Sequence, residues 1–272
     1  MLWNAKNGTV ALGNTEMDYA VFGHGSSCLI LLPGLSDGLA TVAGKAVMLA
    51  GPYRRYLEKF TIYMFSRKRQ LPEGYTIREM AEDQAMAMER LEIEKASVMG
   101  VSQGGMIAQF LAALYPEKTE KLVLAVTAPF ADGQIRACIQ EWMRLARKGD
   151  HRALMIDTAE KCYTGEYLKR FRKIYPIIGQ IGKPSDYRRF LINAEAICNF
   201  DAREVLDKIE CPTLILGGET DQVAGVQASY ALSQAIHGSE LYIYPGHGHG
   251  VYEEEKDFND RVFRFLGWGS SL

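Results

Sequence analysis

The chain contains 272 residues, of which 47% are hydrophobic and 24% are charged. This length can bury a full core and fits one large domain with room for an insertion. The formal net charge of −2 provides no electrostatic footprint for a nucleic acid or an anionic membrane as a partner.

Targeting signals are not evident in the sequence. No apolar run approaches the roughly 20 residues that a membrane-spanning helix needs, and residues 1–10 contain one lysine and no apolar leader region. We therefore expect a cytoplasmic protein without a membrane partner. A short run of charge usually lies in solvent, so the basic triplet Arg67-Lys68-Arg69 is expected in a solvated loop.

The cysteines and histidines argue against a disulfide framework and a metal site. The cysteine number is odd and no pair has CxxC spacing. We expect buried free thiols at Cys28, Cys138, Cys162, Cys198 and Cys211. No histidines show a metal-binding spacing such as HExxH, so we expect no catalytic metal and no cofactor.

The strand pattern predicts the fold class. Residues 9–12 and 16–22 flank Gly13-Asn14, a pair that suits the turn of a hairpin at an antiparallel sheet edge. Short, continuous apolar runs then mark strands buried on both faces, as in a parallel sheet wrapped by helices. These runs are residues 28–32, 60–65, 97–99, 122–126, 213–216 and 241–244. We predict an α/β fold with a mostly parallel, doubly wound sheet of about eight strands.

Helices are predicted between these strands. Thr76 and Glu79 have capping-box spacing, and apolar positions continue the helix to Leu91. Another helix follows residue 102 and ends before Pro116. The last predicted helix covers residues 253–266.

The alternation of strands and helices lapses between Pro129 and Phe200. This stretch is rich in helical pattern and is broken by glycines and prolines. We predict a helical cap at residues 129–199, inserted into a core formed by residues 1–128 and 200–272.

The strand at residues 97–99 leads into Gly100-Val101-Ser102-Gln103-Gly104-Gly105. A serine forced into a tight, positive-φ turn between a strand and a helix needs neighbours without β-carbons. The glycines two residues before and after Ser102 meet that need. The pattern predicts that Ser102 is a nucleophile lifted above the sheet edge.

A nucleophilic serine needs an acid and a base. Asp221 follows the strand at residues 213–216, at the edge where ligands bind in open α/β sheets. It could instead cap a helix that begins near Val223. Glu219 and Asp132 are the alternative acids.

The base is expected in the loop that follows the strand at residues 241–244. Both His247 and His249 lie in this loop. The chain order of the three groups is therefore serine, aspartate, histidine.

This order, the turn around Ser102 and the strand-terminal positions resemble the α/β-hydrolase family over nearly the whole chain. The resemblance favours His249 over His247, because the family's histidine precedes an acidic helix start by a few residues. The family's oxyanion-hole loop corresponds to residues 31–38, which implies that the backbone N–H of Leu35 acts together with that of Gln103. Many members have His-Gly where this chain has Pro33-Gly34.

The resemblance implies a serine hydrolase with the triad Ser102, His249 and Asp221. The predicted substrate is a small carboxylic ester or a related acyl compound, which passes through an acyl-enzyme. Expected substrate contacts are Gly34, Met106 and Trp142. A serine in the turn argues against the dehalogenase and epoxide hydrolase members of the family, which have an aspartate there.

Other functions stay open at this stage. The same triad serves carbon–carbon bond hydrolases, peptidases and acyltransferases, and some members sense ligands with little turnover. A nucleotide-binding fold is excluded because no GxGxxG or Walker motif follows an early strand. The expected partner is a small-molecule acyl substrate, and the sequence leaves the oligomeric state open.

Overall fold

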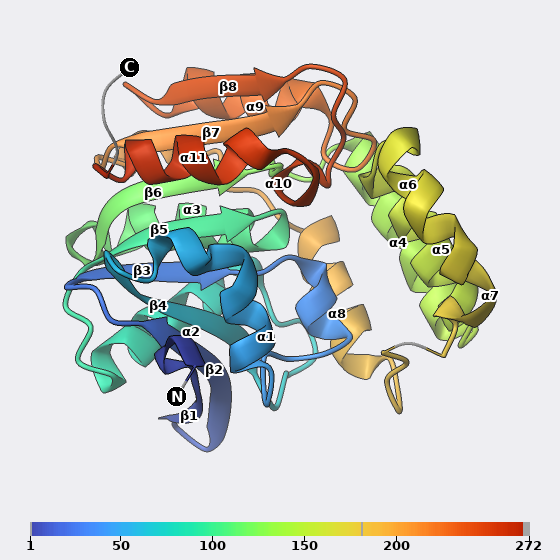
Figure 1. Cartoon of the computed structure of the whole chain (residues 1–272), viewed down its shortest axis with the longest axis horizontal. Helices are drawn as coiled ribbons and strands as arrows, with labels where there is room; N and C mark the ends of the chain where they lie inside the picture. Colours follow the sequence, from blue (N-terminus) through green and yellow to red (C-terminus); the bar gives the residue numbers. More distant parts are fainter. Residues whose placement is uncertain (1, 181, 269–272) are drawn as a thin grey trace.

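The computed structural model describes residues 2–180 and 182–268. Within these residues, eight strands form one sheet with the spatial order β1-β2-β4-β3-β5-β6-β7-β8 (Figure 1). Their bounds are β1 Lys6–Leu12, β2 Thr15–Gly23, β3 Ser27–Leu32, β4 Phe60–Lys68, β5 Ala96–Val101, β6 Thr119–Ala125, β7 Thr213–Gly218 and β8 Glu240–Tyr244. Each predicted apolar run lies in one of these strands, except that the run 122–126 extends one residue past the end of β6, so the predicted fold class is confirmed.

The predicted hairpin forms the antiparallel edge of the sheet. Strand β1 pairs with β2, and β2 pairs with β4, both in antiparallel orientation. Gly13 lies in the turn between β1 and β2 with φ at +64°, a conformation that glycine adopts without steric cost. All the other pairings, from β4 to β8, are parallel.

The helices follow the strands as the chain winds around the sheet. The α-helices are α1 Ala46–Ala50, α2 Ile77–Arg90, α3 Gln103–Leu114, α4 Gly133–Arg147, α5 His151–Cys162, α6 Gly165–Phe171, α7 Tyr175–Ile178, α8 Arg188–Cys198, α9 Val226–Ala235, α10 Val251–Glu254 and α11 Lys256–Phe265. Short 3₁₀ helices are η1 Leu2–Asn4, η2 Leu35–Gly38, η3 Gly51–Tyr56, η4 Pro116–Lys118, η5 Arg172–Ile174 and η6 Leu206–Lys208.

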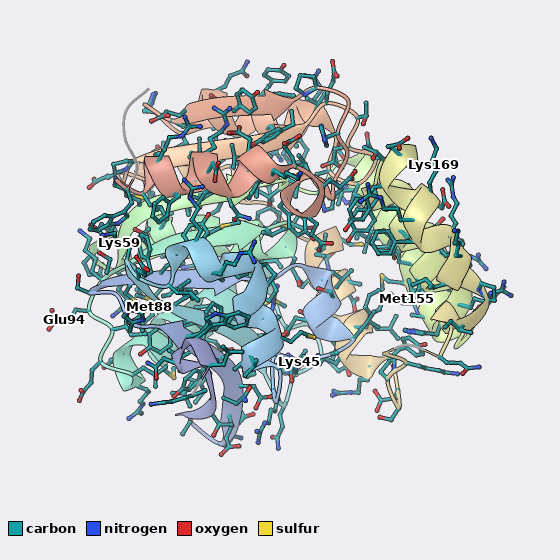
Figure 2. All side chains as sticks on the ribbon, viewed as in Figure 1. Lys45, Lys59, Met88, Glu94, Met155 and Lys169 are labelled. Atoms are coloured by element: carbon teal, nitrogen blue, oxygen red, sulfur yellow. The ribbon has the colours of Figure 1, made fainter. Side chains whose placement is uncertain are left out.

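Helices cover both faces of the sheet, which explains why its central strands are continuously apolar. Every residue of β5 and of β7 is buried. In β3, Ile30 and Leu32 pack into the core beneath α2 and α3, whereas Leu29 and Leu31 pack into the core beneath α1 and α11. Charged side chains such as those of Glu94 and Lys169 point outward (Figure 2).

The chain's last predicted helix is divided in the structure. The predicted span 253–266 contains the end of α10 and the whole of α11, separated at Glu255. Glu255 has extended backbone angles, and its side chain accepts a hydrogen bond from the backbone N–H of Asp257. It therefore caps a new helix instead of continuing the first.

Helices α4 to α8 all lie between β6 and β7 in the chain, where the insertion was predicted. They lie beyond the end of the sheet toward which the parallel strands point (Figure 1). Helix α4 packs against α5 and α8, and α8 packs against η2, the short helix that follows β3. The insertion thus meets the core near the strand ends.

The prediction of a solvated loop at the basic triplet was wrong for Arg67 and Lys68, which both lie in β4. The side chain of Arg67 is among the largest fully buried ones, with 1% of the residue exposed. The neighbouring Lys68 is partly exposed beside Asp83, and Arg69 pairs with Asp18. Burial of a guanidinium is tolerated only where polar groups bind it.

No helix within residues 2–180 and 182–268 is long and apolar enough to cross a membrane. All five cysteines are free thiols. Only Cys138 is fully buried, and the other four are partly exposed, so the prediction of burial holds for one of them.

The capping box at α2 gives a first test of the fold. The Thr76 hydroxyl accepts from the N–H of Glu79, and the Glu79 carboxylate accepts from the N–H of Thr76. We expect Thr76→Ala to lower the free energy of unfolding by about 0.5–2 kcal/mol, measured by urea denaturation. Thr76→Ser keeps the hydroxyl and is expected to cost less; equal losses in both variants would contradict the capping role.

Candidate active site

Ser102 occupies a strained turn between β5 and α3. Its φ is +54° and its ψ −119°, a region that non-glycine residues rarely adopt. The turn depends on close backbone packing. A β-carbon at residue 100 would lie 2.3 Å from the carbonyl oxygen of Gly104, and one at residue 104 would lie 1.9 Å from that of Leu32. Only glycine fits either position.

The end of β6 holds this turn in place. The backbone N–H of Ser102 donates to the carbonyl of Ala125 over 2.9 Å. The Thr127 hydroxyl donates to the carbonyl of Ser102 over 2.7 Å. Both backbone polar groups of Ser102 are therefore bound, and its side chain remains available for other contacts.

The structure brings the three predicted triad residues together. The hydroxyl oxygen of Ser102 lies 2.9 Å from Nε2 of His249, and Nδ1 of His249 lies 2.8 Å from Oδ2 of Asp221. His249 and Asp221 are buried, with 6% and 7% of each residue exposed, whereas Ser102 is partly exposed. The two groups behind the hydroxyl are therefore more shielded from solvent than Ser102 itself.

Asp221 makes the contacts that both alternatives from the sequence require. Its Oδ2 faces His249, and its Oδ1 accepts hydrogen bonds from the backbone N–H groups of Val223 and Ala224 at 2.8 and 2.9 Å. Burial alone would raise the pKa of Asp221, but His249 and the two backbone donors together lower it. The carboxylate therefore stays ionised and is fixed in orientation.

The alternative acids lie elsewhere in the structure. Asp132 caps α4 by accepting from the N–H of Ile135. Glu219 accepts from the N–H of Gly246. In the structure, the carboxylate on Nδ1 of His249 is that of Asp221.

His247 is turned toward other groups. Its Nδ1 donates to the carbonyl of Pro245 over 2.9 Å, and its Nε2 lies 3.5 Å from a carboxylate oxygen of Glu255. The structure thus places His249, and not His247, at hydrogen-bond distance from Ser102.

Two helices begin close to Ser102. Leu35 is the first residue of η2 and Gln103 the first residue of α3, so neither N–H has a carbonyl partner within its own helix. The loop before η2 approaches the serine closely, since a β-carbon at Gly34 would lie 3.3 Å from the Ser102 β-carbon. This geometry can place two donors around an oxygen atom held near Ser102.

The predicted substrate contacts occupy different positions. Gly34 lies beside Ser102. Met106 is buried in the first turn of α3, and its N–H donates to the carbonyl of Ser102. Trp142 is buried in α4, and its indole N–H donates to Asp157 of α5, so this contact lies within the insertion. A substrate contact for any of the three stays a prediction.

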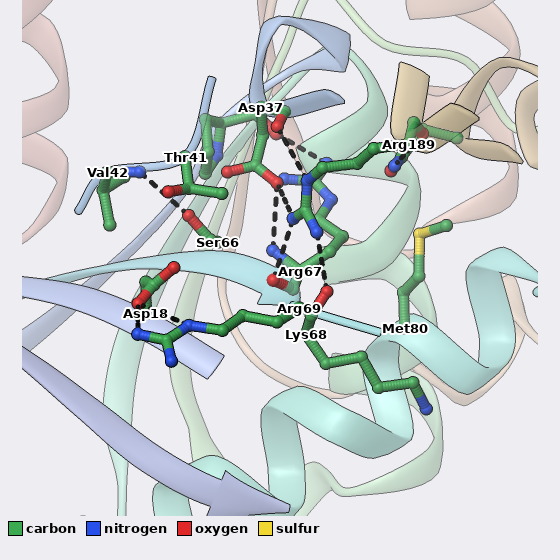
Figure 3. A network of polar contacts seen from close by, with 12 residues as sticks. Asp18, Asp37, Thr41, Val42, Ser66, Arg67, Lys68, Arg69, Met80 and Arg189 are labelled. Atoms are coloured by element: carbon green, nitrogen blue, oxygen red, sulfur yellow. Dashed lines mark hydrogen bonds and ion pairs between the residues drawn. The ribbon is translucent and has the colours of Figure 1, made fainter. Parts of the chain in front are cut away.

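Sequence reasoning missed a largely buried polar cluster around η2, which contains Asp37, Arg67, Gln103 and Arg189. Figure 3 shows Asp37, Arg67 and Arg189 of this cluster. Asp37, Arg67 and Arg189 come from three separate segments of the chain. Sequence reasoning had placed Arg67 in a solvated loop and had considered Gln103 only for its backbone N–H. One signal was available: Asp37 lies within the loop that the resemblance assigned to the oxyanion hole.

The arrangement can move a proton from the Ser102 hydroxyl to His249 as the serine oxygen attacks an electrophile. Asp221 can stabilise the imidazolium that results. Within residues 2–180 and 182–268, no group of three or more His, Cys, Asp or Glu side chains is placed to hold a metal ion.

A family model and several known proteins match most of this chain. A model of the family described as "alpha/beta hydrolase fold" matches residues 63–256. A protein of Yersinia enterocolitica, provisionally assigned as carbamate hydrolase RutD, is 28% identical over 200 residues, which cover 72% of this chain and 72% of that protein. Serine hydrolase BPHL of Mus musculus is 26% identical over 273 residues, covering 94% of this chain and 85% of that protein.

Solved structures share the fold. The crystal structure of the enol-lactonase from Burkholderia xenovorans LB400 matches with a TM-score of 0.81 and 24% sequence identity. The match covers 96% of this chain and 100% of that one.

The two histidines of the β8 loop can be separated by their effect on Ser102. We expect His249→Ala to slow covalent labelling of Ser102 by a fluorophosphonate by about 10³-fold or more, because the hydroxyl loses its proton acceptor. His247→Ala should slow labelling by about tenfold or less, since it disturbs only the loop. Intact-protein mass spectrometry over time measures both rates, and the opposite ranking would assign the base to His247.

Proposed function

The chain belongs to the alpha/beta hydrolase fold family, and on that basis we propose that it is a serine hydrolase that cleaves a small carboxylic ester or a related acyl compound. The observation that carries the proposal is the continuous hydrogen-bonded line from Ser102 through His249 to Asp221, with distances of 2.9 and 2.8 Å. Nucleophile, base and orienting acid are thus in the geometry that acyl transfer requires.

The first half-reaction forms an acyl-enzyme. The Ser102 oxygen attacks the acyl carbon, and its proton passes to Nε2 of His249. The carbonyl electron pair moves onto the oxygen, which the N–H groups of Leu35 and Gln103 stabilise. When the tetrahedral intermediate collapses, the carbon–oxygen bond to the alcohol breaks, and His249 returns the proton to the leaving oxygen.

The second half-reaction uses water in place of the alcohol. His249 takes a proton from the water as it attacks the acyl carbon, and Ser102 leaves with that proton. Asp221 accepts a hydrogen bond from the Nδ1–H of His249 throughout, which keeps Nε2 free to act as the base. Its lowered pKa favours the charged form that this role needs.

The names of similar proteins support this substrate class. One relative is named a serine hydrolase, and the Burkholderia structure is named an enol-lactonase. A lactone is a cyclic carboxylic ester, so its cleavage uses the same bond changes. The Yersinia relative is assigned to carbamates. A carbamate, like an ester, has a carbonyl carbon bonded to a heteroatom, so related acyl compounds are included in the proposal.

We assign the insertion at residues 129–199 the function of a cap that selects the acyl group. Its helix α8 packs on η2, directly beside the proposed oxyanion donors. The proposed substrate contacts are Gly34 and Met106 from the core and Trp142 from the insertion. Apolar contacts of this kind distinguish substrates by about 1–3 kcal/mol each.

Labelling and turnover together test the nucleophile. We expect a fluorophosphonate to modify Ser102 alone, and 4-nitrophenyl esters of increasing chain length to be hydrolysed with turnover. Ser102→Ala should abolish labelling and lower kcat by several orders of magnitude, with a residual rate from the remaining machinery. The adduct is located by peptide mass spectrometry and turnover by released nitrophenol.

Two outcomes would contradict this proposal. Labelling that persists in Ser102→Ala, or a loss of turnover below about tenfold, would place the nucleophile elsewhere. If the wild-type protein binds an ester tightly but releases no product, its function would instead be ligand sensing.

The acid is tested by an isosteric change. We expect Asp221→Asn to keep the fold, because the amide oxygen can still accept from Val223 and Ala224, yet to lower kcat by about 10⁴-fold through the wrong histidine tautomer. Circular dichroism checks the fold, and ester hydrolysis measures kcat. Asp132→Asn serves as the control and should leave kcat near the wild-type value; the reverse result would move the acid to the β6 side.

A further inference from the structure

We propose that Arg189 of helix α8 is a positioning residue that holds the two oxyanion donors in place. This inference rests on the proposed function, because it assigns a purpose to residues around the backbone N–H groups of Leu35 and Gln103. Neither Arg189 nor its partners touch the reacting atoms. Their effect is on the loops that carry the donors.

Arg189 binds four oxygen atoms from two segments of the core (Figure 3). Its Nη2 donates to Oδ2 of Asp37 over 2.8 Å, and its Nε donates to the carbonyl of the same residue over 3.1 Å. It also donates to the carbonyls of Arg67 and Lys68 at 2.9 and 2.7 Å. A single guanidinium thus ties η2, which begins at Leu35, to the end of β4.

Arg67 binds the same region from the opposite side. Its Nη2 donates to the carbonyl of Pro33 over 2.7 Å and to the side-chain oxygen of Gln103 over 2.8 Å. The first of these residues lies two positions before Leu35, and the second is itself a proposed donor. One buried nitrogen therefore contacts both chain segments that form the oxyanion hole.

Charge explains why this cluster is rigid. Burial lowers the pKa of Arg67, while the carboxylate of Asp37 opposes that change. Oδ2 of Asp37 accepts from the backbone N–H of Arg67 and from the side chain of Arg189. The Asp37 side chain is 1% exposed and that of Arg189 is 18% exposed. A shielded, hydrogen-bonded ion pair resists displacement more than an exposed one does.

Helix α8 adds a second contact one turn further along. The side-chain nitrogen of Gln103 donates to the carbonyl of Asn193 over 3.0 Å, and the Asn193 side chain donates back to the carbonyl of Arg189 over 2.9 Å. The helix therefore holds η2 through Arg189 and the start of α3 through Asn193. Both donors are fixed to the same rigid element.

The consequence for catalysis follows from where charge develops. Donors of an oxyanion hole act on the tetrahedral intermediate and only weakly on the bound substrate, so their exact placement affects kcat more than KM. If Arg189 served only to attach the insertion, its loss would lower stability without that selective effect. The two possibilities therefore differ in a kinetic signature.

The experiment compares Arg189→Gln with Arg188→Gln. Arg188 is the matched control, because it precedes Arg189 on the same helix but forms an exposed ion pair with Glu73, with side chains 59% and 75% exposed. Hydrolysis of 4-nitrophenyl acetate gives kcat and KM for each variant. An aryl trifluoromethyl ketone serves as the probe of the tetrahedral state, since Ser102 adds to its carbonyl carbon and leaves a negative oxygen in the hole.

For Arg189→Gln we expect kcat to fall by about 10- to 100-fold, with KM changed by less than about threefold. This decrease in kcat is at most about as large as the decrease caused by removing one oxyanion-hole donor. The affinity for the ketone should fall by the same factor as kcat/KM. Arg188→Gln should match the wild type in all three quantities. Arg189→Lys keeps the charge beside Asp37 but cannot reach all four oxygens, so its losses should lie between these limits.

The outcomes separate the two proposals. If wild-type protein is neither labelled by a fluorophosphonate nor active on the ester, the proposed function fails. If the wild type is active and Arg189→Gln keeps both its kcat and its affinity for the ketone, the positioning role fails. A rise in KM with unchanged kcat would also overturn it. If Arg189→Gln does not fold, as judged by circular dichroism, Arg189→Lys decides between the same results.

Discussion

The close passage of the β3 loop over the first turn of α3 is the constraint on which the site depends. At Gly104 the backbone of α3 lies so near the carbonyl of Leu32 that no β-carbon fits between them. This contact places the loop of residues 33–35 beside Ser102. Two helices, η2 and α3, begin on either side of this contact. A bulkier residue at position 104 would push the loop that follows β3 away from Ser102.

The polar cluster behind this contact is stabilised by hydrogen bonds and ion pairs among its own members. A buried arginine in β4 would be costly alone, and removing one partner of such a group commonly costs several kcal/mol. One nitrogen of the Arg67 guanidinium binds both Pro33 and Gln103, and the Asp37 carboxylate favours the charged form of Arg67. The same bonds fix the loops on either side of Ser102, so the stability of the cluster and the geometry of the site have a common cause.

Much of this fold could be predicted from local sequence pattern. The eight strands, the edge hairpin and the capping box at Thr76 depend on residues close together in the chain, and the structure confirms them. The placement of Ser102, Asp221 and His249 at strand ends followed from the order of elements in a parallel sheet. Their distances come from the structure, and their catalytic function is the proposal above.

The buried cluster could not be predicted in this way. Asp37 and Arg67 are 30 residues apart, and Asp37 and Arg189 are 152 apart. A lone basic triplet gives no indication of which member turns inward, because the decision belongs to partners that only the tertiary structure brings near. The break at Glu255 was missed for a related reason, since a glutamate can continue a helix or cap the next one.

The insertion contacts the loop that carries His249 as well as η2 and the start of α3. The N–H of Gly250, directly after His249, donates to the carbonyl of Cys162 at the end of α5. Two residues later in the insertion, the backbone N–H of Thr164 donates to the Glu254 carboxylate over 3.0 Å.

Through α8 the insertion binds η2 and the start of α3, and through the residues that follow α5 it contacts the loop that carries His249. A rigid movement of the whole insertion away from the sheet would therefore break both sets of contacts at once. Motion of the insertion that leaves both sets of contacts in place must occur within it, between these two attachments. The insertion is therefore part of the frame that holds the residues around Ser102.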